Sequence, residues 1–218
     1  MVAEQIKEDK IFFVYGSGGH SNLAAQEVFF RAGGLMHASA ILDPGTLLSS
    51  GALRSIAIER TPDYGKIVID DYNLQEGDLL IIINAYGINA ATMDAVLEAK
   101  KRKVNTIGVS SHKHAKNTPE DHQARHPSKK NLHEITDVSI DSKIKVGDAV
   151  LDIEGQEQKA GAISTFTNAF ILNSISNEVI SKLSAEKIQP PIWKSGNATG
   201  GDKWNAQFIN RFKDRIKN

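Results

Sequence analysis

The chain has 218 residues, no cysteine and no net charge, with 26 basic residues against 26 acidic ones. Without cysteine it forms no disulfide, no thiolate nucleophile and no cysteine-ligated zinc site, and this composition suits a reducing compartment. Zero net charge removes the overall positive field of proteins that bind nucleic-acid backbones, so any anion site has to be local. We therefore expect a cytoplasmic protein with no nucleic-acid partner.

Long apolar runs are also missing. The longest, Leu79–Ile83, is too short to cross a bilayer, and the first ten residues contain no hydrophobic signal core, so we expect no membrane partner. The length fits one domain, and the apolar fraction of 40% and charged fraction of 24% are near the globular average. We predict a domain over residues 1–190 and a tail over 191–218 that packs on the same domain or on a partner subunit.

Short apolar runs alternate with longer amphipathic stretches, which is typical of parallel strands joined by helices. The class is therefore α/β. The predicted strands are residues 11–15, 37–42, 79–83, 104–109 and 138–140. The predicted helices are residues 21–32, 46–59, 88–101 and 162–182, and residues 110–131 are predicted to be a long loop with at most one short helix.

Polar turns containing glycine follow the first and third predicted strands. The first turn is GSGGHS at 16–21, and the second is NAYGIN at 84–89. Each opens a helix, where free backbone N–H groups favour an anion, although a glycine turn is often only a tight connection. In a doubly wound sheet of order 2-1-3-4-5 these two strands are neighbours, and their carboxyl ends open a ligand crevice.

Three segments in this order resemble the sugar isomerase (SIS) domain: GSGGHSNLAAQEVFFRAGG, ILDPGTLLSSGALRSIAIER and GQEQKAGAISTFTNAFILNSISNEV. The likeness spans about residues 11–202 and is greatest to phosphosugar isomerases related to phosphoheptose isomerase. It implies a doubly wound, flavodoxin-like sheet of five parallel strands, a phosphorylated sugar as ligand, and a homodimer or homotetramer with sites near subunit interfaces. Only about ten residues precede the first strand, where such domains usually begin with a helix, so the chain resembles a short form.

The resemblance also implies substrate-binding residues. Ser17 and Ser21 match hydroxyls of the first loop, and Ser164 and Thr165 match the pair that opens the last helix. In the second loop only the glycine and the last asparagine match, because the usual serines are replaced; its backbone amides and side chains are expected to donate hydrogen bonds instead, which also admits an uncharged or larger sugar derivative. The other substrate-binding candidates are Gly18, His20, Asn84, Gly87, Asn89, Ser110, Glu157 and Lys159.

Aldose–ketose isomerisation needs a base that moves a proton between adjacent carbons, and a carboxylate with a histidine would suffice. Glu27, in the first helix, matches a metal-ligating histidine of phosphoheptose isomerase, and the alternative is a solvated surface charge. Glu59 falls in a segment similar to the family's active-site side, and the alternative is an ion pair with Arg54 or Arg60. Glu157 and Lys159 can reach the same crevice or pair with each other on the surface.

The loop after the fourth strand is rich in histidine and basic residues, and it could form a cationic lid over an anionic sugar. A solvated polar loop is the alternative. His114 is the preferred acid–base candidate because it follows the strand closely and fits the family pattern, and His126 is second. No cofactor is predicted; a divalent metal such as zinc, held by Glu27 and loop histidines, is a lesser alternative, since no pair of histidines at helical spacing supports it.

The leading hypothesis is a phosphosugar-binding protein that acts as an aldose–ketose isomerase through an enediolate. Its candidate catalytic residues are Glu27, Glu59 and His114. One alternative is a non-catalytic sugar-phosphate sensor. Another is a different SIS-type reaction, either deamination of an amino sugar or cleavage of an ether, because a fold does not determine its chemistry.

Overall fold

The structure is a computed structural model that describes residues 1–216 of the chain. The strands are β1 (Phe12–Gly16), β2 (Ala38–Ile41), β3 (Leu79–Ile83), β4 (Asn105–Ser110), β5 (Val138–Asp141), β6 (Ala149–Leu151) and β7 (Ala160–Ala162). The helices are α1 (Val2–Lys7), α2 (Ser21–Val28), the 3-10 turn η1 (Leu48–Ser50), α3 (Ala52–Glu59), α4 (Tyr64–Asp71), α5 (Ala90–Lys101), α6 (His112–Asn117), α7 (Leu132–Ile135), α8 (Ser164–Ala185) and α9 (Gly201–Phe212).

Five strands form one parallel sheet in the order β2-β1-β3-β4-β5, which confirms the predicted doubly wound α/β fold. Within it Tyr15 of β1 pairs with both Ile41 of β2 and Ile82 of β3. The first and third strands therefore end side by side, and the turns that follow them meet at the same edge of the sheet.

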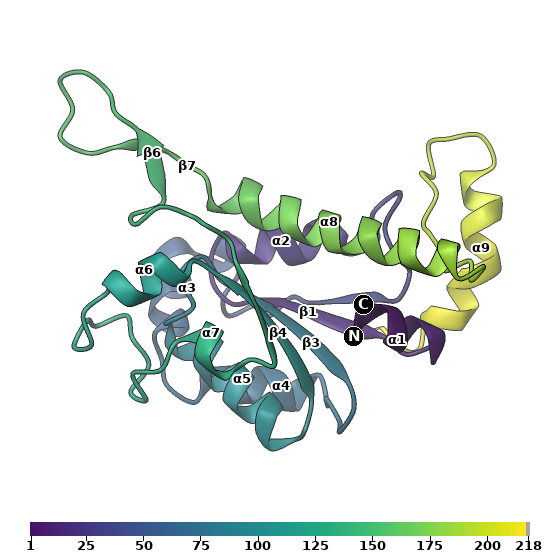
Figure 1. Cartoon of the computed structure of the whole chain (residues 1–218), viewed down its shortest axis with the longest axis horizontal. Coiled ribbons are helices and arrows are strands. Elements are labelled where there is room, and N and C mark those ends of the chain that lie inside the picture. Colours follow the sequence, from purple (N-terminus) through teal and green to yellow (C-terminus); the bar gives the residue numbers. More distant parts are fainter. Residues whose placement is uncertain (217–218) are drawn as a thin grey trace.

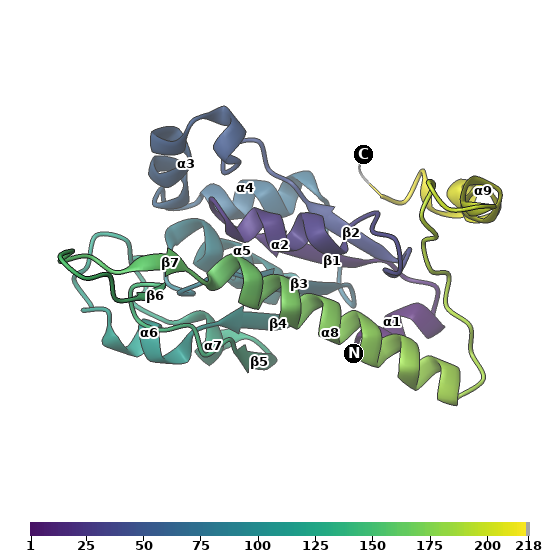
Figure 2. The ribbon, with the colours of Figure 1, turned by 90° about the horizontal axis from the view of Figure 1, so that it is seen from above.

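The central strand β3 is buried on both faces, and its side chains alternate between two cores. Leu79, Ile81 and Ile83 pack with residues of α1, α2 and α8 on one face. Leu80 and Ile82 pack with residues of α4, α5 and α7 on the other. Figure 1 shows α2 and α8 over one side of the sheet with α4 and α5 beneath it, and Figure 2 shows α8 lying along the strands.

The C-terminal segment packs on the same chain. Trp193, Phe212 and Ile216 form a third apolar cluster with Ile11 and Met36. Arg211 and Arg215, which belong to α9 and the turn after it, both bond to the carboxylate of Asp9. Residues 217 and 218 of the predicted tail lie outside the described residues.

Several parts of the fold differ from the prediction. The short stretch before β1 forms the helix α1, the predicted helix 46–59 is divided at Gly51 into η1 and α3, and α7 and α9 were not predicted. α2 ends at Val28 rather than at residue 32, because Gly33 and Gly34 form backbone hydrogen bonds with Trp193 of the C-terminal segment. α4 was not predicted. The antiparallel hairpin β6–β7 was not predicted either, and Figure 1 shows it projecting from the body of the molecule. No helix within residues 1–216 has the length and apolar character needed to cross a membrane.

The close approach of α4 to α5 depends on Gly65. A Cβ atom at this position would lie 2.1 Å from the carbonyl oxygen of Ala91 and 2.7 Å from the amide nitrogen of Ala95. We predict that Gly65→Ala forces the helices apart and lowers the free energy of unfolding by about 2 kcal/mol. That loss corresponds to roughly 4–8 °C in Tm for a domain of this size.

Thermal and urea unfolding measure this effect, with Lys66→Ala as the control because Lys66 is the exposed neighbour on the same helix. A Gly65→Ala protein as stable as the control would contradict the tight α4–α5 contact.

Candidate functional site

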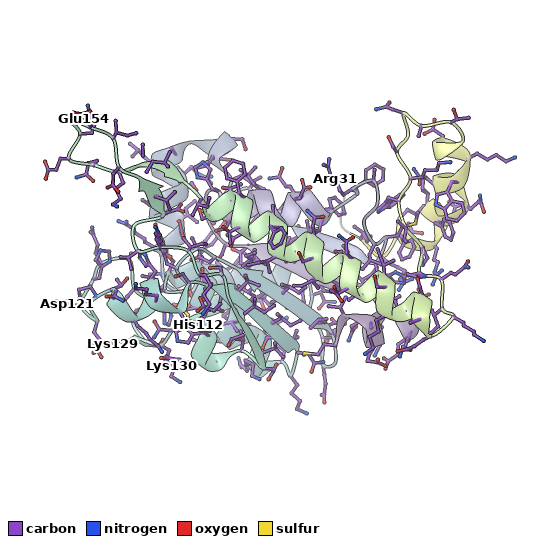
Figure 3. The ribbon with its side chains drawn as sticks, turned by 45° about the horizontal axis from the view of Figure 1, so that its top comes forward. Arg31, His112, Asp121, Lys129, Lys130 and Glu154 are labelled. Carbon is purple, nitrogen blue, oxygen red and sulfur yellow. The ribbon has the colours of Figure 1, made fainter. Side chains whose placement is uncertain are left out.

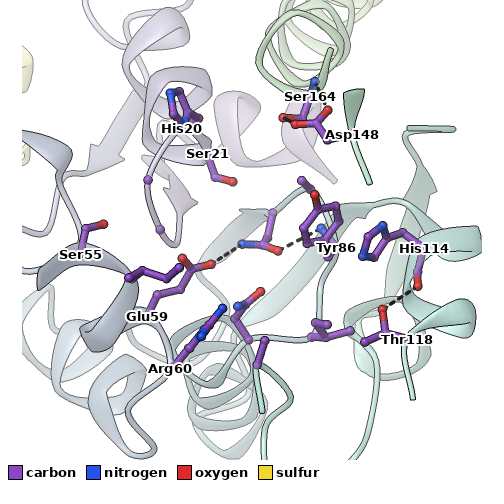
Figure 4. Close-up of a pocket in the computed structure, with 18 of the residues that line it drawn as sticks. His20, Ser21, Ser55, Glu59, Arg60, Tyr86, His114, Thr118, Asp148 and Ser164 are labelled. Atoms are coloured by element: carbon purple, nitrogen blue, oxygen red, sulfur yellow. Dashed lines mark hydrogen bonds between the residues drawn. The ribbon is translucent and has the colours of Figure 1, made fainter. Parts of the chain in front are cut away.

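A cavity of about 710 Å³ opens at the carboxyl edge of the sheet. Its walls come from the turn after β1, from η1 and α3, from the turn after β3, from α6 and the loop that follows it, and from the first residue of α8. This is the crevice expected between neighbouring strands whose helices lie on opposite faces. Figure 4 shows Glu59 and Arg60 on one side of it, Tyr86 and His114 on the other, and Asp148 with Ser164 above.

Glu59, the last residue of α3, places its carboxyl group against the first glycine turn. A Cβ atom on Gly18 would lie 2.3 Å from Glu59 Cδ, and Gly18 has φ +105°, so only glycine admits the carboxyl group here. Burial raises the pKa of Glu59 to about 7, against the opposing effects of a hydrogen bond from Asn84 and the charge of Arg60. Such a carboxyl group is balanced between acid and base near neutrality.

Asn84 uses both ends of its side chain within the protein. Its Nδ2 donates to the carbonyl oxygen of Ser17 at 2.8 Å and to Glu59 Oε1 at 3.4 Å. Its Oδ1 accepts hydrogen bonds from the amides of Tyr86 (3.1 Å) and Gly87 (2.8 Å). These two amides of the second loop are therefore already hydrogen-bonded within the chain, to the Asn84 side chain.

His114 and Tyr86 form the opposite wall. Their rings stack with centroids 3.5 Å apart and planes 13° apart. The amide of Gly147 donates to His114 Nδ1 at 3.2 Å, so the proton of the neutral ring is on Nε2. Burial lowers the pKa of His114, which favours that neutral form. The neutral His114 ring, which lines the cavity, therefore carries an N–H donor rather than a fixed charge.

The N-terminus of α8 is capped from a distance by Asp148. One carboxylate oxygen accepts from the amides of Ile163 (3.0 Å) and Ser164 (2.8 Å), and the other accepts from the Ser164 hydroxyl at 2.6 Å. A carboxylate is favoured at a helix N-terminus for the same reasons as a phosphate. The amides at the start of α8 are thus satisfied by a group of the chain itself.

Eight predicted site residues line the cavity, and the other candidates lie elsewhere. Lining it are Gly18, His20, Ser21, Glu59, Asn84, Asn89, His114 and Ser164. Ser17 is buried behind the first turn, where its hydroxyl bonds to Thr92. Gly87 and Ser110 pack against each other behind the second turn, and Thr165 does not reach the cavity.

Glu27 is not brought to the cavity in this chain: it pairs with Arg31 at 3.2 Å and accepts from Asn173 at 3.3 Å. Glu157 and Lys159 lie in the exposed β6–β7 hairpin, where Lys159 pairs with Asp152. Figure 3 shows how far this hairpin, with Glu154 at its end, stands from the sheet.

The histidine-rich loop divides into two groups. His114 and His122 line the cavity. His126 Nδ1 accepts from the amide of Ser128, so its Nε2 donates to Asp94 at 2.9 Å, and His112 stacks on His133. Lys129 and Lys130 lie at the outer surface (Figure 3). Within residues 1–216, no group of three or more His, Asp or Glu side chains is placed to hold a metal ion.

Sequence reasoning missed two charged residues of the cavity. Arg60 was considered only as a partner for Glu59, although its position next to Glu59 at the end of α3 was a usable signal. Asp148 gave no signal, because a capping side chain normally comes directly before its helix and Asp148 precedes Ser164 by 16 positions.

Comparison with known proteins agrees with this geometry. A model of the SIS domain matches residues 1–111. A UPF0309 protein of Caldanaerobacter subterraneus subsp. tengcongensis is 36% identical over 214 residues, which cover 97% of this chain and 85% of that protein. The chain belongs to the SIS domain family. A UPF0309 protein of Halalkalibacterium halodurans is 37% identical to this SIS domain protein, over 99% of this chain and 84% of that protein. One from Streptomyces griseus subsp. griseus is 34% identical over the same shares of the two chains.

Membership of the SIS family suggests that this protein binds a sugar phosphate. The names of these relatives state no substrate or reaction. The finer likeness to phosphoheptose isomerase therefore stays a prediction.

The raised pKa of Glu59 has a consequence for stability. Below pH 4.5 the Glu59 carboxyl group is mostly protonated in both the folded and unfolded states, so folding does not have to bury a charge. Between pH 4.5 and about 7 the unfolded chain ionises first, so stability is lost as the pH rises. We predict that Glu59→Gln is more stable than the wild-type protein at pH 8, by up to about 3 kcal/mol, and equally stable at pH 4.

Urea unfolding at both pH values measures the difference. Glu178→Gln is the matched control, because Glu178 is exposed on α8. A Glu59→Gln protein that shows the same pH dependence as the wild type would mean that Glu59 ionises normally.

Proposed function

We propose that this SIS domain protein is an aldose–ketose isomerase that binds a sugar phosphate in the cavity. The observation that carries the proposal is the Glu59 carboxyl group, buried against Gly18 with a pKa raised to about 7 and facing the Tyr86–His114 wall. A base whose pKa is near the working pH removes protons from carbon most effectively.

The proposed reaction uses two groups of the chain. Ionised Glu59 takes the proton from the carbon next to the carbonyl group, and the electrons of that C–H bond form the C=C bond of an enediolate. The carbonyl oxygen gains the charge, which the neutral His114 ring stabilises through its Nε2–H. Return of the proton from Glu59 to the former carbonyl carbon, together with transfer of the proton of the adjacent hydroxyl group to the former carbonyl oxygen, gives the isomer.

The remaining walls suit a sugar. His20, Ser21 and Asn89 offer polar groups, while Leu48 and Ile56 line the mouth with apolar surface. The volume of about 710 Å³ lies within the ordinary range of ligand pockets, roughly 300–1,000 Å³. The cavity therefore has room for a phosphorylated sugar and for an additional substituent on it.

Exchange of solvent deuterium into sugar phosphates tests the reaction, because the proton on Glu59 exchanges with solvent before Glu59 returns it to the enediolate. We predict exchange into at least one member of a panel of pentose, hexose, heptose and amino-sugar phosphates. Glu59→Gln should lower the rate by about 10²-fold or more, since it removes the base. His114→Ala should lower it less, and Glu178→Gln should leave it unchanged.

The outcomes separate the alternatives. A ligand that raises Tm without any exchange would favour a sugar-phosphate sensor over an isomerase. Exchange that survives Glu59→Gln would remove Glu59 from the reaction. Release of ammonia or of an ether substituent would point to another SIS-type reaction.

The pH dependence offers a second test. Because only ionised Glu59 acts as a base, we predict that kcat/KM rises with pH and levels off above an apparent pKa of about 7. Asn84→Ala should move this pKa higher, since the hydrogen bond from Asn84 stabilises the carboxylate. A wild-type profile that is flat from pH 5 upward would contradict the assignment.

A further inference from the structure

The cavity has few charges with which to receive a phosphate. Among its described lining residues the carboxyl groups are those of Glu59 and Asp148, and the one arginine or lysine is Arg60. Burial lowers the pKa of His114, so this lining histidine favours its neutral form. A sugar phosphate therefore enters a cavity that holds two acidic groups, and its charge needs a specific partner.

Two groups of backbone amides that could receive a phosphate are already used by the chain. The amides of Tyr86 and Gly87 donate to Asn84, and the amides of Ile163 and Ser164 donate to Asp148. The Glu59 carboxyl group lies against Gly18 in the first turn. A phosphate at any of these places would have to displace a group that is hydrogen-bonded or closely packed.

Arg60, in contrast to these amides, has a hydrogen-bond donor that the described part of the chain does not use. It follows α3 directly and faces the cavity beside Glu59 (Figure 4), but no carboxylate of residues 1–216 lies within 4.0 Å of its guanidinium group. Its Nε is buried and has no hydrogen-bond partner in the described part of the chain. A buried donor left unpaired costs about 1–3 kcal/mol, so an unused guanidinium group at a cavity wall points to a missing acceptor.

We propose that Arg60 is the residue that binds the phosphate group of the sugar ligand. This inference rests on the proposed sugar-phosphate function. It assigns the phosphate to a side chain instead of to the backbone amides of the loops. A guanidinium group binds a phosphate through two parallel hydrogen bonds, which fixes the orientation of the ligand as well as its charge. Glu59 is the next residue along the chain, so the anchor and the base are held on the same helix end.

Calorimetric titration with inorganic phosphate at constant ionic strength tests the proposal. Arg60→Gln should weaken phosphate binding by about 10- to 100-fold, the range expected when a charge-assisted hydrogen-bond pair is lost. Arg60→Lys should lie between, because it keeps the charge and loses the paired geometry. Lys66→Gln removes one positive charge from an exposed site outside the cavity and should bind as the wild-type protein does.

A second variant locates the alternative receptor. Asp148→Ala frees the amides at the start of α8. If this variant binds phosphate more tightly while Arg60→Gln binds as the wild type does, the helix end is the receptor and the proposal is wrong. Absence of phosphate binding by the wild-type protein also overturns it. Unchanged Tm values for the Arg60 variants show that lost binding is not unfolding.

The deuterium-exchange assay keeps the two proposals apart. If no sugar phosphate exchanges but Arg60→Gln still loses phosphate, Arg60 is an anion receptor and the isomerase proposal fails. If exchange occurs and Arg60→Gln leaves both phosphate binding and KM unchanged, the isomerase proposal stands and the role of Arg60 is wrong.

Discussion

The Asn84 side chain connects three segments that meet at the carboxyl edge of the sheet. It holds the carbonyl group of Ser17 after β1, the carboxyl group of Glu59 at the end of α3, and two amides of its own turn after β3. Asn84 is buried, so these bonds replace water that no longer reaches the groups. The turn shape that they fix sets the position of Tyr86, and with it the ring on which His114 stacks.

The cavity combines features that oppose stability with features that support it. Ionisation of Glu59 lowers the stability of the folded state, because its carboxyl group is largely buried. The guanidinium group of Arg60 also lowers stability, because its Nε donor is buried without a partner among the described residues. Other groups offset this: Asp148 satisfies the start of α8, and Asn84 satisfies the turn after β3. Two buried polar atoms without a hydrogen-bond partner within residues 1–216, Arg60 Nε and Asn89 Oδ1, belong to residues that line the cavity, where a ligand can complete their interactions.

The sequence predicts the sheet well because the length and spacing of the apolar runs indicate which segments are buried strands. β3 is apolar at every position, and only a strand covered on both faces requires that. The position of Glu59 was also predictable, since it ends a helix in a segment that resembles the active-site side of the family. Asp148 and the projecting hairpin were not, because a cap supplied from 16 positions away and an exposed polar hairpin leave no periodic pattern. The hydrogen bonds of Asn84 within the turn were not predictable, because an amide suits a ligand and a backbone turn equally well.

The strand order also determines how long β1 waits for its second partner strand during synthesis. β1 takes its partners from both β2 and β3, and Asn84 follows Ser17 by 67 positions. A ribosome that adds about 5–20 residues per second needs on the order of 3–13 s to produce that stretch. During this interval the newly made β1 has one edge without a neighbour and an apolar side without its cover. The nascent chain is thus exposed to aggregation for seconds before its central strand arrives, and chaperone contact would be most useful then.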